Sequence, residues 1–375
     1  GIGTSTLTEA LSVVGNISNI LDFNSPIVEA GDTSVIGSIE GVFVSGRYAY
    51  TVNGAANALS VIDVSNASVP VVIATAAVGN GPSSVFVSGR YAYVTNKGSD
   101  TLSVVDISNP AVPVQVGETS VGSDPTSVFV SGRYAYIAND GSDNLSIVDI
   151  SNPQQPLQIS AIVGANGSGS QSIYVSGRYA YTANSADNSV SIIDISNPSS
   201  PILASTTFVG LGNNPGSIYV SGRYAYITSN GNPVLIILDI SNPLVPVKQS
   251  ETVVGNFPYY VSVSGRYAFI ADYSDVALNV MDVSSSTAPT QVLSATLMDT
   301  PKSLYVAGRY VYIGGDTGRF SVVDMTGTEV TSLIAQSAEV GSFQSRNDVV
   351  AQGNIIAGTS LIVGAGGIDQ GTLAA

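Results

Sequence analysis

The chain has 375 residues, of which 44% are hydrophobic and 10% are charged, and its formal net charge is −15. This composition is that of a folded protein, and the length suits one large closed β domain. The acidic charge argues against nucleic acid and anionic membranes as partners, and no apolar run is long enough for a transmembrane helix. Histidine and cysteine are absent, which excludes disulfides, thiol nucleophiles and histidine-based catalysis or metal binding. Because the sequence begins with Gly1 and not with Met, we expect a processed product from which a signal peptide has been removed.

Residues 1–36 precede a repeated region, and we expect them to form an N-terminal extension. Within this extension, residues 21–26 resemble the end of one strand and residues 27–35 resemble the strand that follows it in each repeat. A strand at this place could pair with the last unit of the repeated region. The extension is therefore a candidate closing strand.

Residues 37–341 contain a motif that recurs seven times. The tripeptide Gly-Arg-Tyr returns every 43–45 residues, and each copy is followed by two apolar residues and an aspartate. A fixed period of this length is typical of architectures that stack one small structural module many times. The glycines of the seven motifs are Gly46, Gly89, Gly132, Gly177, Gly222, Gly265 and Gly308.

Each unit predicts four β-strands. In the third unit we expect strands over residues 126–131, 133–138, 144–150 and 157–163. These segments are rich in β-branched and aromatic residues, and turns containing Gly, Asn or Pro separate them. Because the strands are apolar on both faces, each small sheet should be covered on both sides, as in radially stacked four-stranded blades. The predicted fold class is all-β, a seven-bladed β-propeller.

The arginine of each motif lies a constant distance from the aspartate of the same unit. The separation is 16 residues in six units and 15 in the last. In an antiparallel hairpin a fixed separation gives a fixed cross-strand neighbour, so we expect one buried or half-buried ion pair in every blade. A ring of arginines that binds an anionic ligand is the alternative. The expected pairs are Arg47–Asp63, Arg90–Asp106, Arg133–Asp149, Arg178–Asp194, Arg223–Asp239, Arg266–Asp282 and Arg309–Asp324.

Two aromatic residues follow each of these arginines, two positions apart on one strand face. Tyr48 and Tyr50 are the first such pair, and Tyr267 with Phe269 is the variant. Their simplest role is packing between blades, with the hydroxyl group at a polar edge. Stacking against sugars is the alternative.

The repeats resemble a known family. Residues 128–136 (Val-Phe-Val-Ser-Gly-Arg-Tyr-Ala-Tyr) and 145–153 (Leu-Ser-Ile-Val-Asp-Ile-Ser-Asn-Pro) resemble LVIVD repeats, and the resemblance recurs in all seven units. It implies a β-propeller. It also implies an extracellular or cell-surface location, where such repeats occur in bacteria and archaea. It implies no particular activity, because one fold serves many functions.

Residues 342–375 depart from the repeat and form an expected C-terminal extension. Both ends of the chain carry Gly-rich β motifs similar to those of phage tail fibres and bacterial surface fibres. The seventh unit has its own candidate fourth strand at residues 329–340, so a closing strand at 27–35 would leave one strand surplus. Residues 348–359 together with 20–35 could instead make a split eighth blade.

A surplus strand is able to pair with the sheet edge of another chain. If such head-to-tail contacts do not close, they produce a filament. We therefore expect an extracellular structural protein that assembles into a fibre or surface layer, with copies of itself as partners. The alternative is an adhesin or tail-fibre-like module that binds a glycan or a protein.

Catalysis is not expected, because no unit carries a distinctive pair of acids and no phosphate-binding loop is present. We expect no cofactor, no metal, no nucleic acid partner and no membrane insertion. Covalent glycans are expected on Asn-X-Ser sequons in exposed turns. The candidate acceptors are Asn16, Asn66, Asn144 and Asn166.

Overall fold

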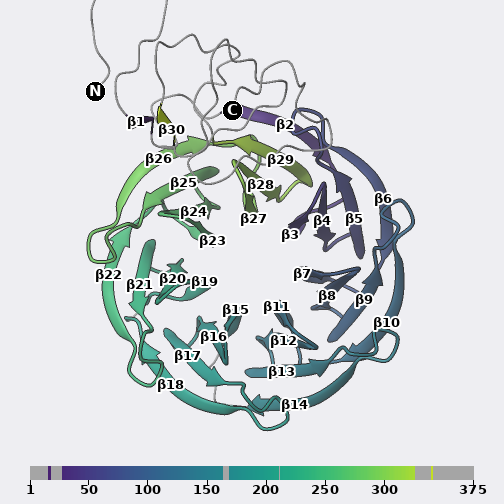
Figure 1. The fold of residues 1–375 in the computed structure, drawn as a ribbon, viewed down its shortest axis with the longest axis horizontal. Helices are drawn as coiled ribbons and strands as arrows, with labels where there is room; N and C mark the ends of the chain where they lie inside the picture. Colours follow the sequence, from purple (N-terminus) through teal and green to yellow (C-terminus); the bar gives the residue numbers. More distant parts are fainter. Residues whose placement is uncertain (1–15, 18–27, 164–168, 211, 326–338, 341–375) are drawn as a thin grey trace, which may run out of the picture. The chain divides into compact units, whose positions relative to one another are not determined.

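The computed structural model describes residues 16–17, 28–163, 169–210, 212–325 and 339–340. The chain divides into two units, residues 22–328 and residues 1–21 with 329–375. In the first unit the described residues form seven four-stranded antiparallel sheets arranged as a ring, with no helix among them (Figure 1). The predicted all-β, seven-bladed β-propeller is confirmed. Since the described residues contain no helix, none of them forms one that could span a membrane.

Every blade runs through its four strands in the same order, from the centre of the ring outward. The innermost strands are β3 (Ile39–Ser45), β7 (Pro82–Ser88), β11 (Pro125–Ser131), β15 (Ser170–Ser176), β19 (Pro215–Ser221), β23 (Pro258–Ser264) and β27 (Pro301–Ala307). The second strands are β4 (Tyr48–Asn53), β8 (Tyr91–Asn96), β12 (Tyr134–Asn139), β16 (Tyr179–Asn184), β20 (Tyr224–Ser229), β24 (Tyr267–Asp272) and β28 (Tyr310–Gly315). The third strands are β5 (Ala58–Asp63), β9 (Thr101–Asp106), β13 (Asn144–Asp149), β17 (Ser189–Asp194), β21 (Val234–Asp239), β25 (Ala277–Asp282) and β29 (Arg319–Asp324). The outermost strands are β6 (Val71–Ala77), β10 (Val114–Ser120), β14 (Leu157–Val163), β18 (Ile202–Phe208), β22 (Val247–Val253), β26 (Thr290–Thr296) and, for the seventh blade, β2 (Val28–Ser34).

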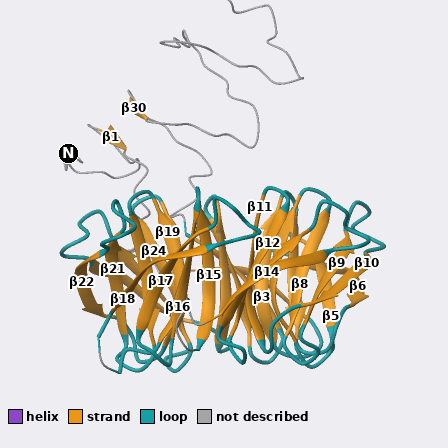
Figure 2. Cartoon of the chain, turned by 90° about the horizontal axis from the view of Figure 1, so that it is seen from below, coloured by secondary structure: helices purple, strands orange, loops and turns teal. Residues whose placement is uncertain are grey.

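The observed strands agree with the predicted ones to within about one residue at most ends. In the third blade the second strand begins at Tyr134, because Gly132 and Arg133 form the turn that precedes it. The sheets stand side by side around the ring (Figure 2), and side chains on both faces of each sheet are buried against the neighbouring blades. Tyr136 and Ile147 of the third blade, for example, share a cluster with Ile173 of the fourth. The prediction that each sheet is covered on both sides is confirmed.

The ring is closed by the N-terminal strand. β2 pairs antiparallel with β29, so residues 28–34 complete the seventh blade. The guanidinium of Arg319 holds this strand through Glu29 (Nη2–Oε1 3.1 Å) and Asp32 (Nη1–Oδ2 3.3 Å). The predicted closing strand is confirmed, and the split eighth blade is wrong because its N-terminal strand is used in the seventh.

The two ends of the chain contribute one further pair of short strands. β1 (Asn16–Ile17) pairs in parallel with β30 (Glu339–Val340). Residues 329–340 were the predicted fourth strand of the seventh blade, and this assignment is wrong because β2 holds that position. The tail motif at 342–375 and the segment 348–359 lie outside the described residues.

Closure depends on one close approach between the last blade and the first. A Cβ atom placed on Gly31 of β2 would lie 2.6 Å from the backbone oxygens of Ala67 and Ser68, in the loop before β6. We expect Gly31→Val to push β2 away from this loop and to lower the free energy of unfolding by about 1–3 kcal/mol, as overpacking does.

Thermal or denaturant unfolding measures this effect. Ser34→Val is the matched control, because Ser34 lies on the same strand and is exposed. Equal stability of the two variants would contradict closure by β2.

Candidate functional site

The Gly-Arg-Tyr motifs form the turns between the first and second strands of the blades. The seven glycines all have φ of 59–60°. This left-handed conformation favours glycine, and the open space around each turn shows that the backbone angle, not crowding, requires it. The repeat of the tripeptide therefore follows from turn geometry.

The structure brings together all seven predicted Arg–Asp pairs. The arginine guanidinium contacts the aspartate carboxylate in every blade, as predicted. Two details differ. Asp63 lies opposite Tyr48, with Arg47 one residue before it in the turn. The arginines are also less buried than expected: their side chains are 56–60% exposed in the first six blades, whereas the aspartates are 11–19% exposed.

Each pair belongs to a small unit that we call the staple: the arginine, its aspartate and the following tyrosine. In the second blade Asp106 accepts hydrogen bonds from Arg90 and from the backbone N–H of Ser108 (2.9 Å). The guanidinium carbon of Arg90 lies 5.2 Å from the ring centre of Tyr91, a cation–π distance. The bond from Arg90, followed by that from Ser108, lowers the pKa of Asp106 to about 2.

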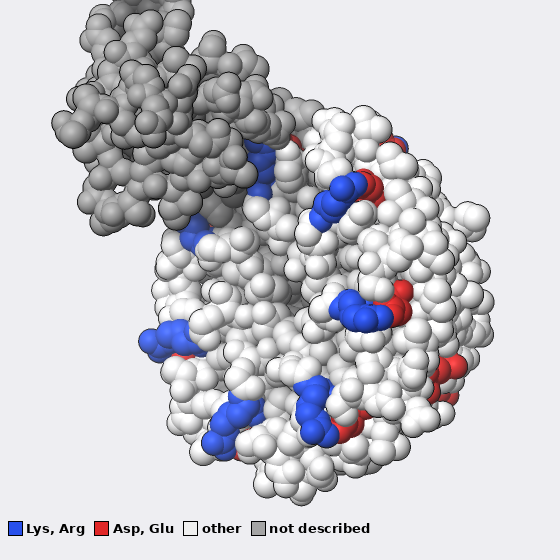
Figure 3. Space-filling view, turned by 45° about the vertical axis from the view of Figure 1, so that its right-hand side comes forward, with Lys and Arg blue, Asp and Glu red and all other residues white. Residues whose placement is uncertain are grey.

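The staples occupy the face of the ring where the first strands end. They form separate charged spots on a surface that otherwise carries few charges (Figure 3). Because each guanidinium is already paired and stacked, the geometry favours the structural interpretation over a ring that binds an anion. Solvent screens a pair whose guanidinium is exposed, so the staples add little to stability and act mainly on register and loop shape.

The staple predicts an acid-sensitive part of the stability. Since the pKa of Asp106 is lower in the folded chain than its usual value of 3.8, the stabilisation is complete above about pH 4 and is lost as the pH falls toward 2. Asp106→Asn keeps an acceptor for Ser108 but loses the charge. We expect this variant to be less stable than wild type by up to about 1 kcal/mol at neutral pH and by less near pH 2.

Denaturant unfolding at several pH values measures the difference, and Arg90→Met alone and combined with Asp106→Asn completes a double-mutant cycle. A difference that does not change between pH 6 and pH 2 would argue against the ion pair as its cause.

The aromatic residues of the second strands have the predicted packing role. Tyr50 is 3% exposed and packs with Val85 and Val87 of the next blade. The sequence interpretation missed a second aromatic set, three residues before the motif glycine in six of the seven blades. Successive rings of this set lie 4.8 Å apart around the channel: Phe43, Phe86, Phe129, Tyr174 and Tyr219, with Tyr305 on the other side of Phe43.

The sixth blade departs from this set. Ser262 stands where the other blades have an aromatic residue, and Tyr260 comes two residues earlier on the same strand. Burial, together with the neighbouring Tyr219 and Tyr305, raises the pKa of Tyr260 to about 12. Tyr260 stands at the third position of its strand, where five other blades have Ser, and it lines the cavity described next.

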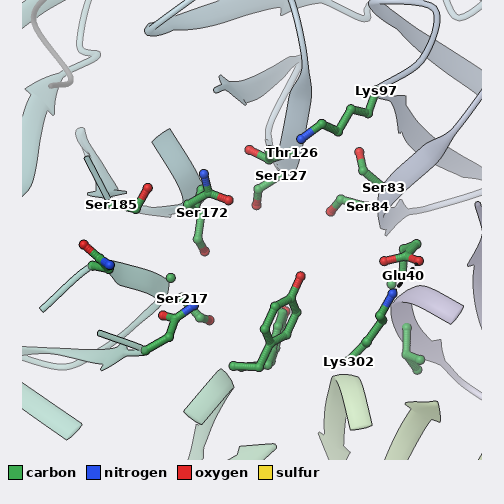
Figure 4. A pocket seen from close by; sticks show the side chains of 18 of the residues that line it. Glu40, Ser83, Ser84, Lys97, Thr126, Ser127, Ser172, Ser185, Ser217 and Lys302 are labelled. Carbon is green, nitrogen blue, oxygen red and sulfur yellow. Dashed lines mark hydrogen bonds and ion pairs between the residues drawn. The ribbon is translucent and has the colours of Figure 1, made fainter. Parts of the chain in front are cut away.

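A cavity of about 630 Å³ lies at the channel mouth on the other face of the ring (Figure 4). Its wall is formed mainly by the first few residues of the innermost strands. Six residues separate these from the staple turns, which at 3.3 Å per residue is about 20 Å along the strand. The second residue of each innermost strand lines it, and we call these seven residues the bulge ring. They are Glu40, Ser83, Thr126, Gln171, Gly216, Tyr259 and Lys302.

One ion-pair network lies at this mouth. Lys302 binds Glu40 (Nζ–Oε1 3.1 Å) and Asp316 (Nζ–Oδ1 2.8 Å). Burial would lower the pKa of Lys302, but the bond to Asp316 and the charge of Glu40 more than offset this and raise it. Asp316 also accepts from Ser38 (3.1 Å) and from the hydroxyl of Tyr273 (3.3 Å). The sequence interpretation missed this network because its members are far apart in the chain.

The four glycan candidates have different outcomes. Asn66 is exposed in a loop and remains a candidate. Asn144 is 9% exposed, and its Oδ1 accepts from Nδ2 of Asn139 at 2.7 Å, so the expectation of an exposed turn is wrong there. Asn16 belongs to β1. Asn166 lies outside the described residues. Within the described ranges, no three His, Cys, Asp or Glu side chains are grouped as metal ligands would be.

These features define the class of protein: a seven-bladed β-propeller built from tandem copies of one sequence unit. The LVIVD repeat family matches seven segments, residues 36–77, 82–120, 122–161, 167–207, 214–250, 260–296 and 301–337. The chain belongs to the LVIVD-repeat family. No curated protein matches it in sequence.

Solved structures share the fold at low sequence identity. The hydrazine synthase of Kuenenia stuttgartiensis is 18% identical, with a TM-score of 0.66, over 77% of this chain and 96% of that one. The Cps50 (Swd1) β-propeller domain of Myceliophteria thermophila is 12% identical, with a TM-score of 0.64, over 80% and 99%. The computationally designed Ika8 protein is 8% identical, with a TM-score of 0.54, over 78% and 97%. Proteins of different description thus share this architecture, and the likeness shows the fold alone.

Proposed function

We propose that this protein is an extracellular structural protein that assembles into a fibre or surface layer, in which terminal β-strands of one copy bind the propeller of the next. The observation that carries the proposal is that two segments of the chain have the sequence of a fourth strand for the seventh blade, which has room for one. The seventh repeat match runs to residue 337 and so includes a fourth-strand sequence of its own. The fourth position is nevertheless occupied by β2.

The chain therefore has one strand sequence more than its ring uses. Residues 329–375 and 1–21 form a unit separate from residues 22–328, and within it β1 and β30 pair with each other. Segments that pair as strands but are not needed for the ring can supply contacts between copies. A contact of this kind is heterologous and extends into a filament when it does not close.

The propeller offers edges to such a strand. The fourth strand of each blade is outermost and has one unpaired edge. Exposed apolar residues begin five of these strands: Val71, Val114, Leu157, Ile202 and Val247, which are 49–66% exposed. A strand added to this edge gains backbone hydrogen bonds and covers apolar surface.

The assembly is extracellular in this proposal, and covalent glycans are its further partners. The sequon at the exposed Asn66 and the absence of oxidation-sensitive cysteine suit such a location. The proposal assigns no catalytic role, because the aspartates that recur in every blade are bound within the staples.

Deletion of residues 329–375 tests the proposal. We expect the full chain to sediment as large assemblies and to form fibres or sheets in electron micrographs, whereas the deletion variant should sediment as a monomer. Its thermal unfolding should be close to that of the full chain, because the deleted segment forms no part of a described blade.

Deletion of residues 1–15 is the matched control at the other end, and it leaves β1, β2 and the ring in place. Assembly of the 329–375 deletion variant to the same extent as the full chain would refute the role of the C-terminal strand. A full chain that remains monomeric at high concentration would refute the function.

A further inference from the structure

The innermost strands combine a repeated frame with one varied position. Their third residue is Ser in five of the seven blades, and their fifth is aromatic in six. The second residue, by contrast, is different in each of the seven blades. The fold therefore does not constrain the second residue as it constrains the third and fifth, and this position is free to serve another role.

The backbone gives this position a special geometry. In every innermost strand the pairing register shifts between the first and third residues, which leaves the second without a partner on the next strand. A bulge of this kind turns a side chain away from the regular alternation of the strand. Here all seven bulged residues line the channel mouth, and Figure 4 labels four of them, Glu40, Ser83, Thr126 and Lys302.

The bulge ring contributes partly to structure and partly to the cavity. Ser83 donates to the carbonyl oxygen of Pro125 (2.6 Å) and Thr126 to that of Ser170 (2.8 Å), so these two hydroxyls join neighbouring blades. Tyr259 holds the same strand position, but it is 36% exposed at the mouth of the channel.

Tyr259 is part of an aromatic wall. Its ring lies 6.3 Å from Phe257 at an interplanar angle of 20° and 6.1 Å from Tyr273. The other described blades have no aromatic residue at the positions of Phe257 and Tyr273. On the side of the sixth blade the cavity is thus lined by two aromatic residues, Tyr259 and Tyr260, and Phe257 and Tyr273 pack against Tyr259.

The remaining walls are polar and close to neutral. Ser, Thr, Gln and Asn side chains provide both donors and acceptors, as the labelled serines and Thr126 in Figure 4 show. Lys302 is neutralised by Glu40 and Asp316, and Lys97 faces Asp140 at 3.9 Å. An anionic ligand would therefore find no unpaired positive charge on Lys302 or Lys97.

We propose that this cavity is a binding site for a hexopyranose unit of a neutral oligosaccharide. Such a sugar has an apolar C–H face that packs on an aromatic ring and hydroxyl groups that both donate and accept hydrogen bonds. Tyr259 provides the stacking surface, and the amide groups of Gln171, Asn214 and Asn230 bind the sugar hydroxyls. The hydroxyls of Ser83 and Thr126 donate to backbone carbonyls and are left as acceptors for the sugar. The volume of about 630 Å³ is within the usual range for small-ligand sites, which is roughly 300–1,000 Å³. The site goes beyond the proposed assembly and does not depend on it, because all its residues belong to the propeller.

Isothermal titration of the full chain with neutral oligosaccharides tests the site. The probes are maltohexaose, cellohexaose, laminarihexaose, mannohexaose and chitohexaose, with a heparin hexasaccharide as the anionic comparison. We expect saturable binding of at least one neutral probe and none of the heparin fragment. Tyr259→Ser, which places the second-blade residue in the sixth blade, should weaken that binding at least about tenfold, as removal of a central aromatic contact does.

Two further variants separate the site from a general effect on the fold. Tyr259→Phe keeps the stacking ring and should retain binding to within about threefold. Phe208→Ser removes an aromatic residue that is 58% exposed on the outermost strand β18, and it should leave binding unchanged. The proposal is overturned if no neutral probe binds, if only the heparin fragment binds, or if Tyr259→Ser binds as tightly as wild type.

Discussion

The structure depends on the pairing of β2 with β29. Seven blades form a ring only if the last blade is as wide as the others, and its fourth strand comes from the opposite end of the chain. The contact joins residues about 290 positions apart, and Arg319 fixes it through Glu29 and Asp32. Closing a loop of this length costs conformational entropy. This cost arises only once, and the closed ring then lets each blade pack against a neighbour on both sides. Because β2 holds the fourth position, the seventh blade does not use the fourth-strand sequence at the end of its own repeat.

The two faces of the ring differ in how strictly their residues repeat from blade to blade. On the staple face the same three side chains recur in each blade, and a glycine at positive φ holds the turn beside them. This uniformity fixes the register of each hairpin, because a shift by one residue would separate each arginine from its aspartate and exchange the side chains that face the two neighbouring blades. On the other face the bulge ring varies. The repeated contacts make the frame tolerant of different side chains at the bulged position, so structure and recognition are carried by opposite ends of the same strands.

Much of this could be predicted from the sequence, because periodic features are visible without coordinates. Constant spacing identified Arg133 with Asp149, and the Gly-Arg-Tyr turns located the first two strands of each blade. The cavity could not be found in this way. Lys302 and Glu40 are 262 residues apart and meet only because the ring closes. Asn144 was misjudged because its sequon looks like a turn, whereas its side chain turns inward to Asn139. The aromatic set around the channel was visible as a period in the sequence and was overlooked.

The most direct test of the account is a disulfide between β2 and β29. The chain has no cysteine, so Asp32→Cys and Ser321→Cys, which replace cross-strand partners, introduce the only two thiols. Partners in an antiparallel pair have Cα atoms about 4.5–5.5 Å apart, within reach of a disulfide. After mild oxidation, mass spectrometry of the digested protein should show one disulfide within a single chain. Thiols that stay reduced, or cross-links found only between chains, would contradict closure of the ring by its own N-terminal strand.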